Sequence, residues 1–269
     1  MHKLVALITD FGTEDHYVAV VKARILSEVS KNPDLSVCFI DITHEVPPQD
    51  VLKACVLLSF SYEYFPEGTI FLAVVDPGVG TERKAVLLKT PKYTFIGPDN
   101  GLFTLVLEKE KEISCYEIIK EKVMLPPFST TFHARDLFAP AVAKVILNED
   151  FSKFCSPIEK ENLVRLNICL ASLKRGERVK LEVLCVDRFG NVVTNLHKND
   201  IRCKKFTIEV NGKPIPFVKT YAEAKPGDFI CLFGSEGFLE IAVNQGSAKD
   251  RLKPADEIIA VCLGEKDEV

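Results

Sequence analysis

The 269-residue sequence lacks the features that mark membrane proteins and nucleic-acid binders. Its longest uncharged apolar stretches, such as residues 70–75, are only as long as a strand, whereas a membrane-spanning helix needs roughly 20 apolar residues. Basic residues number 34 and acidic residues 38, which gives a formal net charge of −4. Without a basic surplus, binding to nucleic acid by neutralising phosphates is not favoured. We therefore expect neither a membrane nor a nucleic acid as partner.

The nine cysteines lack the paired spacing of a metal or redox site. No C-x-x-C pair occurs, which argues against a thiolate zinc site and against a thioredoxin-like motif. Most cysteines have apolar neighbours, as in residues 37–39 and 230–232. This pattern favours reduced thiols that pack as small hydrophobic side chains, and it predicts a cytoplasmic protein.

Strand and helix patterns alternate through the first part of the chain. Short apolar runs at 4–9, 35–42 and 69–75 predict strands. Between them, residues 15–29 and 49–60 carry apolar side chains at helical spacing. This alternation predicts an α/β fold with a mostly parallel sheet flanked by helices.

The pattern changes in the second part of the chain. Segments beyond residue 176 are short and β-like, with turn signals such as Asn211-Gly212 and Pro226-Gly227 between them. They predict a small antiparallel β domain. We expect an N-terminal α/β domain at 1–165 and a C-terminal β domain at 166–269, with a linker in 149–165, where Pro157 and several charges interrupt the apolar pattern.

Aspartates occur at the ends of three consecutive predicted strands: Asp10, Asp41 and Asp76. One such aspartate is usually a turn or helix cap. Because ligands bind beyond the carboxyl ends of parallel strands, three together favour a functional site. Gly78-Val79-Gly80 is only a fragment of a dinucleotide fingerprint, since the next segment is a predicted strand and not a helix.

Two more segments are dense in polar side chains. Residues 129–136 contain His133 and lead into a predicted helix, and residues 187–191 lie between two apolar strands. A loop histidine is more often structural than catalytic, and a polar segment between strands can be a plain β-turn. From the residues alone, both interpretations of each segment stay open.

Taken together, these segments resemble the S-adenosyl-L-methionine (SAM) hydroxide adenosyltransferase family over nearly the whole chain. That family is related to the SAM-dependent fluorinases and chlorinases. The resemblance implies an α/β domain followed by a β domain. It also implies a homotrimer in which SAM lies between the N-terminal domain of one subunit and the C-terminal domain of the next. The matching segments are 9–12, 41–44, 75–80, 97–101, 131–136, 187–191 and 242–246.

The resemblance implies a hydrolase that converts SAM and water to adenosine and L-methionine, by attack of water or hydroxide at C5′. The family's catalytic set matches Asp76, Arg83 and His133. Asp10 matches the position that holds the ribose hydroxyls, and Asp15 lies near that of the methionine amino group. No metal and no cofactor are implied, since SAM is the substrate. The remaining positions that match substrate contacts, besides Asp76, are Asp187, Phe189, Asn191, Ser235, Glu240 and Val243.

These residue types suit that reaction. The leaving group is a neutral thioether, so no general acid is needed, and orienting the nucleophile can supply roughly 7–11 kcal/mol of the barrier reduction. Arg83 can hold Asp76, while His133 can orient the water or accept its proton. A negative Asp76 would repel a halide, which argues against halogenation.

Two alternatives remain if the resemblance is set aside. Oxygen and nitrogen ligands from Asp10, Asp41, Asp76, Asn100 and His133 would suit a metal-dependent phosphohydrolase of nucleotides. The same pocket would also suit a non-catalytic protein that binds SAM or adenosine. Metal analysis would test the first alternative, and adenosine binding without turnover would support the second.

Overall fold

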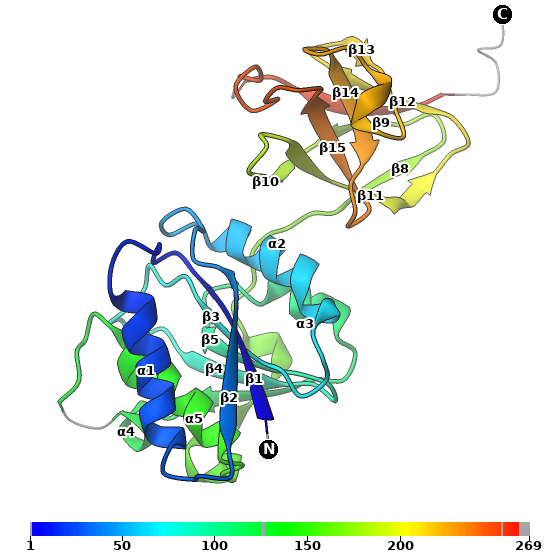
Figure 1. Cartoon of the computed structure of the whole chain (residues 1–269). Helices are drawn as coiled ribbons and strands as arrows, with labels where there is room; N and C mark the ends of the chain where they lie inside the picture. Colours follow the sequence, from blue (N-terminus) through cyan, green and yellow to red (C-terminus); the bar gives the residue numbers. More distant parts are fainter. Residues whose placement is uncertain (1, 125–126, 254, 264–269) are drawn as a thin grey trace, which may run out of the picture. The chain divides into compact units, whose positions relative to one another are not determined.

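The computed structural model describes residues 2–124, 127–253 and 255–263 (Figure 1). The chain divides into two compact units, Met1–Leu166 and Asn167–Val269. Among the described residues, no helix has the length and apolar character needed to cross a membrane.

A seven-stranded sheet with the order β2-β1-β3-β5-β4-β6-β7 forms the centre of the first unit, as far as the chain is described. Strands β2, β1, β3 and β5 are joined by parallel ladders, whereas β4 and β7 run against their neighbours. Most strands thus point the same way, which confirms the expected mostly parallel sheet. The strands are β1 His2–Thr9, β2 Ser36–Thr43, β3 Ile70–Val74, β4 Ala85–Lys89, β5 Thr94–Pro98, β6 Ser114–Ile118 and β7 Cys155–Ile158.

Helices cover both faces of this sheet (Figure 1). Val5 and Leu7 of β1 face a core with α1 and α5, while Ala6 and Ile8 face a core with α2 and α3. This alternation follows from the two-residue period of a strand, and it explains why β1 is apolar throughout. The helices are α1 Tyr17–Val29, α2 Val51–Ser61, α3 Thr104–Lys109, α4 Lys120–Val123 and α5 Ala139–Ile146, with a π-helical turn at Ala134–Phe138.

The expected linker at 149–165 is wrong. Residues 155–158 form β7, which pairs with β6 at the edge of the sheet in the first unit. An edge strand accepts a proline and exposed polar side chains because one of its sides makes no ladder, so Pro157 did not signal a break.

The second unit consists of two sheets that share one apolar core. The first has the order β10-β11-β15-β14, with β8 also paired to β11, and the second has the order β13-β12-β16-β9. All ladders are antiparallel except that between β8 and β11, so the expected β domain is observed with one parallel pair. The strands are β8 Ala171–Lys174, β9 Arg178–Leu181, β10 Val183–Val186, β11 Val192–Arg202, β12 Phe206–Val210, β13 Lys213–Ile215, β14 Phe229–Phe233, β15 Phe238–Val243 and β16 Ile258–Cys262.

All nine cysteines lie in the described ranges, and none of them forms a disulfide. Six are buried, as expected of small hydrophobic side chains, but Cys38 and Cys169 are exposed and Cys203 is half-buried. The apolar neighbours of Cys38 wrongly predicted that it is buried, because β2 is an edge strand on which alternate residues face solvent.

Candidate active site

Asp10 and Asp76, two of the three aspartates predicted at strand ends, lie at the same edge of the sheet. Thr9 pairs with Val74 in the parallel ladder of β1 and β3, so Asp10 and Asp76 follow neighbouring strand ends. Asp41 lies inside β2, and its carboxylate is 2.6 Å from Lys22 Nζ with 41% of the side chain exposed. Asp41 is therefore part of a surface ion pair and does not join Asp76.

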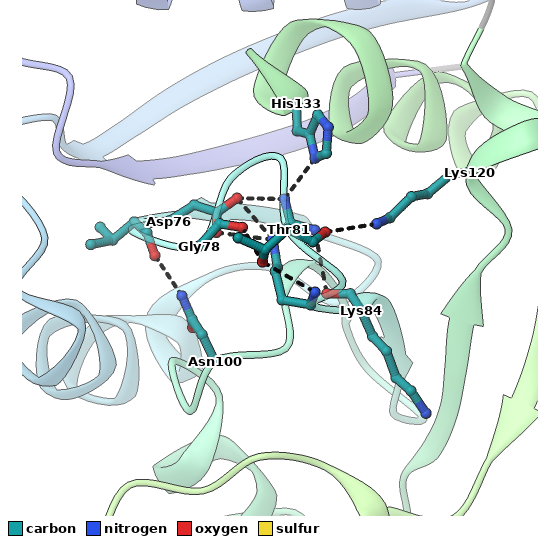
Figure 2. A network of polar contacts seen from close by, with 9 residues as sticks. Asp76, Gly78, Thr81, Lys84, Asn100, Lys120 and His133 are labelled. Atoms are coloured by element: carbon teal, nitrogen blue, oxygen red, sulfur yellow. Dashed lines mark hydrogen bonds and ion pairs between the residues drawn. The ribbon is translucent and has the colours of Figure 1, made fainter. Parts of the chain in front are cut away.

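Asp76 and His133, both labelled in Figure 2, are joined through Arg83 into one contiguous polar cluster in the first unit. Arg83 Nε donates to both carboxylate oxygens of Asp76, at 2.9 and 3.0 Å, and Nη2 donates to Oδ2 at 2.5 Å. The two side chains are only 8% and 6% exposed, so this is a buried ion pair. Arg83 Nη2 also lies 2.9 Å from Nδ1 of His133.

The contact with Arg83 fixes the tautomer of His133. A guanidinium can only donate, so Nδ1 must accept, and the proton of the neutral ring is on Nε2. Burial lowers the pKa of His133, and the charge of Arg83 lowers it further. The imidazole is thus held neutral at physiological pH, with Nε2–H as a donor.

The loop after β3 is shaped to hold these groups. Gly80 has φ +80°, and a Cβ at this position would lie 2.7 Å from the carbonyl oxygen of Thr130, so the loop packs directly on the segment before His133. Lys120 donates to the carbonyl of Thr81 at 3.3 Å, and Asn100 donates to the carbonyl of Val75 at 2.8 Å (Figure 2). The backbone on both sides of Asp76 is therefore fixed.

Asp10 and Asp15 lie in the connection between β1 and α1. Asp10 Oδ2 accepts a hydrogen bond from the backbone N–H of Gln49 at 2.9 Å, and Asp15 is exposed. Phe11 and Phe132 have ring centroids 6.1 Å apart and both pack against Tyr17, at 6.0 and 5.2 Å. Because Phe132 precedes His133, this aromatic group joins the loop of Asp10 to the segment of His133.

In the second unit, all six predicted residues line one cavity of about 720 Å³. Phe189 is exceptionally exposed, at 78%, whereas Asn191 and Val243 are buried. Leu232 and Phe233 add apolar surface. The six are Asp187, Phe189, Asn191, Ser235, Glu240 and Val243.

Hydrogen bonds join the polar residues of this cavity. Asp187 Oδ1 accepts from the backbone N–H groups of Phe189 and Asn191, and Asn191 Nδ2 donates to Asp187 Oδ2 at 2.8 Å. Tyr221 donates its hydroxyl to Glu240 Oε2 at 2.9 Å and lies 3.5 Å from Asn191 Nδ2. Burial raises the pKa of Glu240. The hydrogen bond from Tyr221 acts against this rise, and the negative charge of Asp187 adds to it.

Sequence reasoning missed Tyr221 and the aromatic group of Phe11, Tyr17 and Phe132. Tyr221 lies in a short 3₁₀ turn, Tyr221–Glu223, where no spacing or motif distinguishes it. Phe11 and Phe132 are adjacent to Asp10 and His133, so their place beside predicted site residues was a usable signal.

The structure does not gather the side chains of the metal-site alternative. Within the described ranges, no group of three or more histidine, cysteine, aspartate or glutamate residues is placed to hold a metal ion. Asp41 binds Lys22, and Asn100 bonds the backbone of Val75 and Leu102.

Known proteins match the chain over most of its length. Residues 5–155 match the SAM hydroxide adenosyltransferase N-terminal domain, and residues 181–257 match the C-terminal domain of the same family. The (R)-S-adenosyl-L-methionine hydrolase of Thermus thermophilus is 40% identical over 255 residues, covering 92% of this chain and 94% of that protein. A fluorinase of an Actinoplanes species is 26% identical, covering 90% of this chain and 91% of its own.

A solved structure of a conserved Thermotoga maritima protein shares the fold. Its TM-score is 0.81 at 35% identity, and the match covers 97% of this chain and all of that one. The family match spans both units, and the relatives match almost end to end. The chain belongs to the SAM hydroxide adenosyltransferase family.

Proposed function

We propose that the protein hydrolyses SAM to adenosine and L-methionine by attack of water or hydroxide at C5′. The observation that carries this proposal is the buried cluster of Asp76, Arg83 and His133, which combines a fixed carboxylate, a fixed guanidinium and a neutral imidazole. Relatives 33–40% identical to the chain carry the name (R)-S-adenosyl-L-methionine hydrolase, which supports the same substrate.

The cluster suits a displacement at a sulfonium centre. The C–S bond breaks as the oxygen attacks, the electron pair goes to sulfur, and methionine leaves as a neutral thioether. The site therefore needs no acid for the leaving group, but it must orient the nucleophile and receive its proton. Asp76 keeps acceptor capacity beyond its bonds with Arg83, because a carboxylate offers about four lone-pair sites.

His133 acts by donating a hydrogen bond. Its Nδ1 accepts from Arg83, so only Nε2–H is available to the oxygen of the nucleophile. The tautomer favours orientation of the water by His133, with the proton passing to Asp76. Of the two roles that the residue type allowed, the geometry supports the first.

The cavity of the second unit suits recognition of the adenosine part of the substrate. Phe189, Leu232 and Phe233 offer apolar surface to a flat base, and Asn191 and Glu240 offer polar atoms. In the first unit, Asp10 has one oxygen bonded to Gln49 and can accept from ribose hydroxyls through the other. Asp15 is exposed, and we assign it to the methionine amino group.

We further propose a cytoplasmic homotrimer in which the substrate site lies between subunits, as the family resemblance implies. The candidate catalytic groups and the cavity belong to different units, which fits a site completed by assembly. Nine cysteines without a disulfide fit a reducing compartment. We propose no metal and no cofactor, since expulsion of a neutral thioether needs neither.

The test is to incubate the pure protein with SAM and to follow adenosine and methionine by chromatography. Because the relatives' names carry the (R) descriptor, both sulfonium epimers are supplied. We expect both products from at least one epimer, with activity unchanged by EDTA. A folded, trimeric protein that binds adenosine but releases no product would refute hydrolysis and favour a binding role. Trimer assembly is checked by light scattering.

A further inference from the structure

His44 is a buried histidine that the proposed reaction does not use. It is 5% exposed and follows β2, at the end of the segment 41–44 that resembles the family. Its Nδ1 lies 2.8 Å from the hydroxyl of Thr9, the last residue of β1. Its Nε2 lies 3.1 Å from Asp41 Oδ1, an ion-pair distance and not an aligned hydrogen bond.

The contacts of His44 reach the residues on both sides of Asp10. The backbone N–H of Phe11 donates to the Thr9 hydroxyl at 3.3 Å, so the hydroxyl proton can go to His44 Nδ1. The N–H of Gly12 donates to the carbonyl of His44 at 2.8 Å. Asp10 therefore lies between two residues that this histidine orders, Thr9 through its side chain and Gly12 through its backbone.

The loop that carries His44 also bonds the carboxylate of Asp10. The backbone N–H of Gln49 donates to Asp10 Oδ2 at 2.9 Å, and Gln49 has φ +68°, a conformation rarely adopted by residues other than glycine. Such strain persists only where the surroundings enforce it. The N–H of Val46 adds a bond to the carbonyl of Thr9 at 3.4 Å.

Asp41 contacts both Nε2 of His44 and the surface residue Lys22. Burial would raise the pKa of Asp41, but Lys22 and His44 together lower it, so the carboxylate stays charged beside the imidazole. A carboxylate at this place favours the proton of the neutral ring on Nε2 and leaves Nδ1 to accept from Thr9. The surface ion pair thus favours the tautomer in which Nδ1 of His44 accepts from Thr9.

We propose that His44 is a positioning residue that, through Thr9 and its own loop, holds the Asp10 carboxylate in place to accept the two ribose hydroxyls of the substrate. The proposal rests on the proposed function for the assignment of Asp10. It predicts that loss of His44 weakens only ligands that carry those hydroxyls.

The test compares the affinities of the assembled protein for adenosine and for 2′,3′-dideoxyadenosine by isothermal titration calorimetry. Wild-type protein should prefer adenosine. His44→Gln should weaken adenosine by about tenfold, the usual loss for one oriented hydrogen bond to a charged group, and leave dideoxyadenosine within about twofold. Thr9→Val should act in the same way, and Thr9→Ser should restore the preference.

His2→Gln is the matched control. His2 Nδ1 also contacts a hydroxyl, that of Ser36 at 2.5 Å, but it lies at the opposite end of β1. This variant should keep the preference for adenosine. If His44→Gln does not fold, the Thr9→Val and Thr9→Ser pair decides the question, since valine keeps the shape of threonine.

A second substitution locates the effect. On an Asp10→Asn background, His44→Gln should cause no further loss of adenosine affinity, because the group it positions is already changed. Equal weakening of both nucleosides by His44→Gln, or additive losses in the double variant, would overturn the proposal. If wild-type protein does not turn over SAM, the proposed hydrolase function is refuted instead. The comparison of nucleoside affinities then still decides the role of His44.

Discussion

The two units hold their candidate site residues by different physical means. In the first, the carboxylate of Asp76 is bound by two nitrogens of Arg83, and both side chains are withdrawn from solvent. In the second, the carboxylate of Glu240 is bound by the phenol of Tyr221, beside the largely exposed ring of Phe189. Fixed charge suits a reaction that changes charge, whereas neutral donors and apolar surface suit recognition. We therefore assign the chemical step to the cluster of the first unit and recognition of the adenine base to the cavity of the second.

The largest expected effect comes from removing the candidate catalytic side chains of the first unit. Asp76→Ala and His133→Ala should each lower kcat by roughly 10²–10⁴, because they remove the proposed proton acceptor and the proposed orienting donor, while adenosine affinity stays within a few-fold. Single-turnover kinetics and titration calorimetry measure the two quantities. If affinity fell and kcat did not, the division between the units would be wrong.

Breaking a buried ion pair should cost more stability than breaking an exposed one. Arg83→Met leaves Asp76 charged and buried, so the free energy of unfolding should fall by about 3–5 kcal/mol. Arg178→Met breaks the pair with Glu209 in the second unit, where Arg178 is 56% exposed, and should cost less than about 1 kcal/mol. Urea denaturation measures both, and equal losses would contradict the burial argument.

An exposed aromatic ring tests binding in the second unit. Phe189→Ala should weaken adenosine by about tenfold with little change in melting temperature, because stacking on a base is worth roughly 1–3 kcal/mol and the ring is 78% exposed. Tyr64→Ala is the control, since Tyr64 is 76% exposed in the first unit. The assignment of Phe189 fails if the two variants bind adenosine alike.

Tyr221 tests the hydrogen bonds of the same cavity. Tyr221→Phe removes only the hydroxyl that donates to Glu240, and we expect KM to rise about three- to tenfold with kcat nearly constant. Steady-state kinetics shows the split. A fall in kcat at constant KM would mean that Tyr221 takes part in the chemical step, which would contradict the distinction between the units.

The smallest effect concerns the pH profile. His133 must be neutral to accept from Arg83, and burial, Arg83 and Lys120 keep its pKa below 6.5, so the acidic limb of the activity profile should lie below pH 6.5. Lys120→Met removes one of these charges, so it should raise the pKa of His133 and move the acidic limb of the activity profile to higher pH. Lys122→Met on the same helix should not. NMR titration of His133 shows directly whether its pKa rises in Lys120→Met. A fall in the pKa of His133 would contradict this explanation.

The sequence predicted the sheet and both units because periodicity reports burial directly. It missed β7, since the edge strand carries Pro157 and polar residues that resemble a linker. It found Asp76, Arg83 and His133 through resemblance, but the contact of Arg83 with His133 joins residues 50 apart and follows no spacing rule. The tautomer of His133 and the role of Tyr221 depend on tertiary placement, which no local pattern encodes.

The central claim is that an oxygen from water becomes the 5′-hydroxyl of adenosine. Incubation of the protein with SAM in H₂¹⁸O, followed by mass spectrometry of the nucleoside, tests it most directly. We predict adenosine with one ¹⁸O at the 5′ position and unlabelled methionine in equal amount. Adenosine without label, or no adenosine from a folded and assembled protein, would contradict the assignment of Asp76, Arg83 and His133 to this reaction.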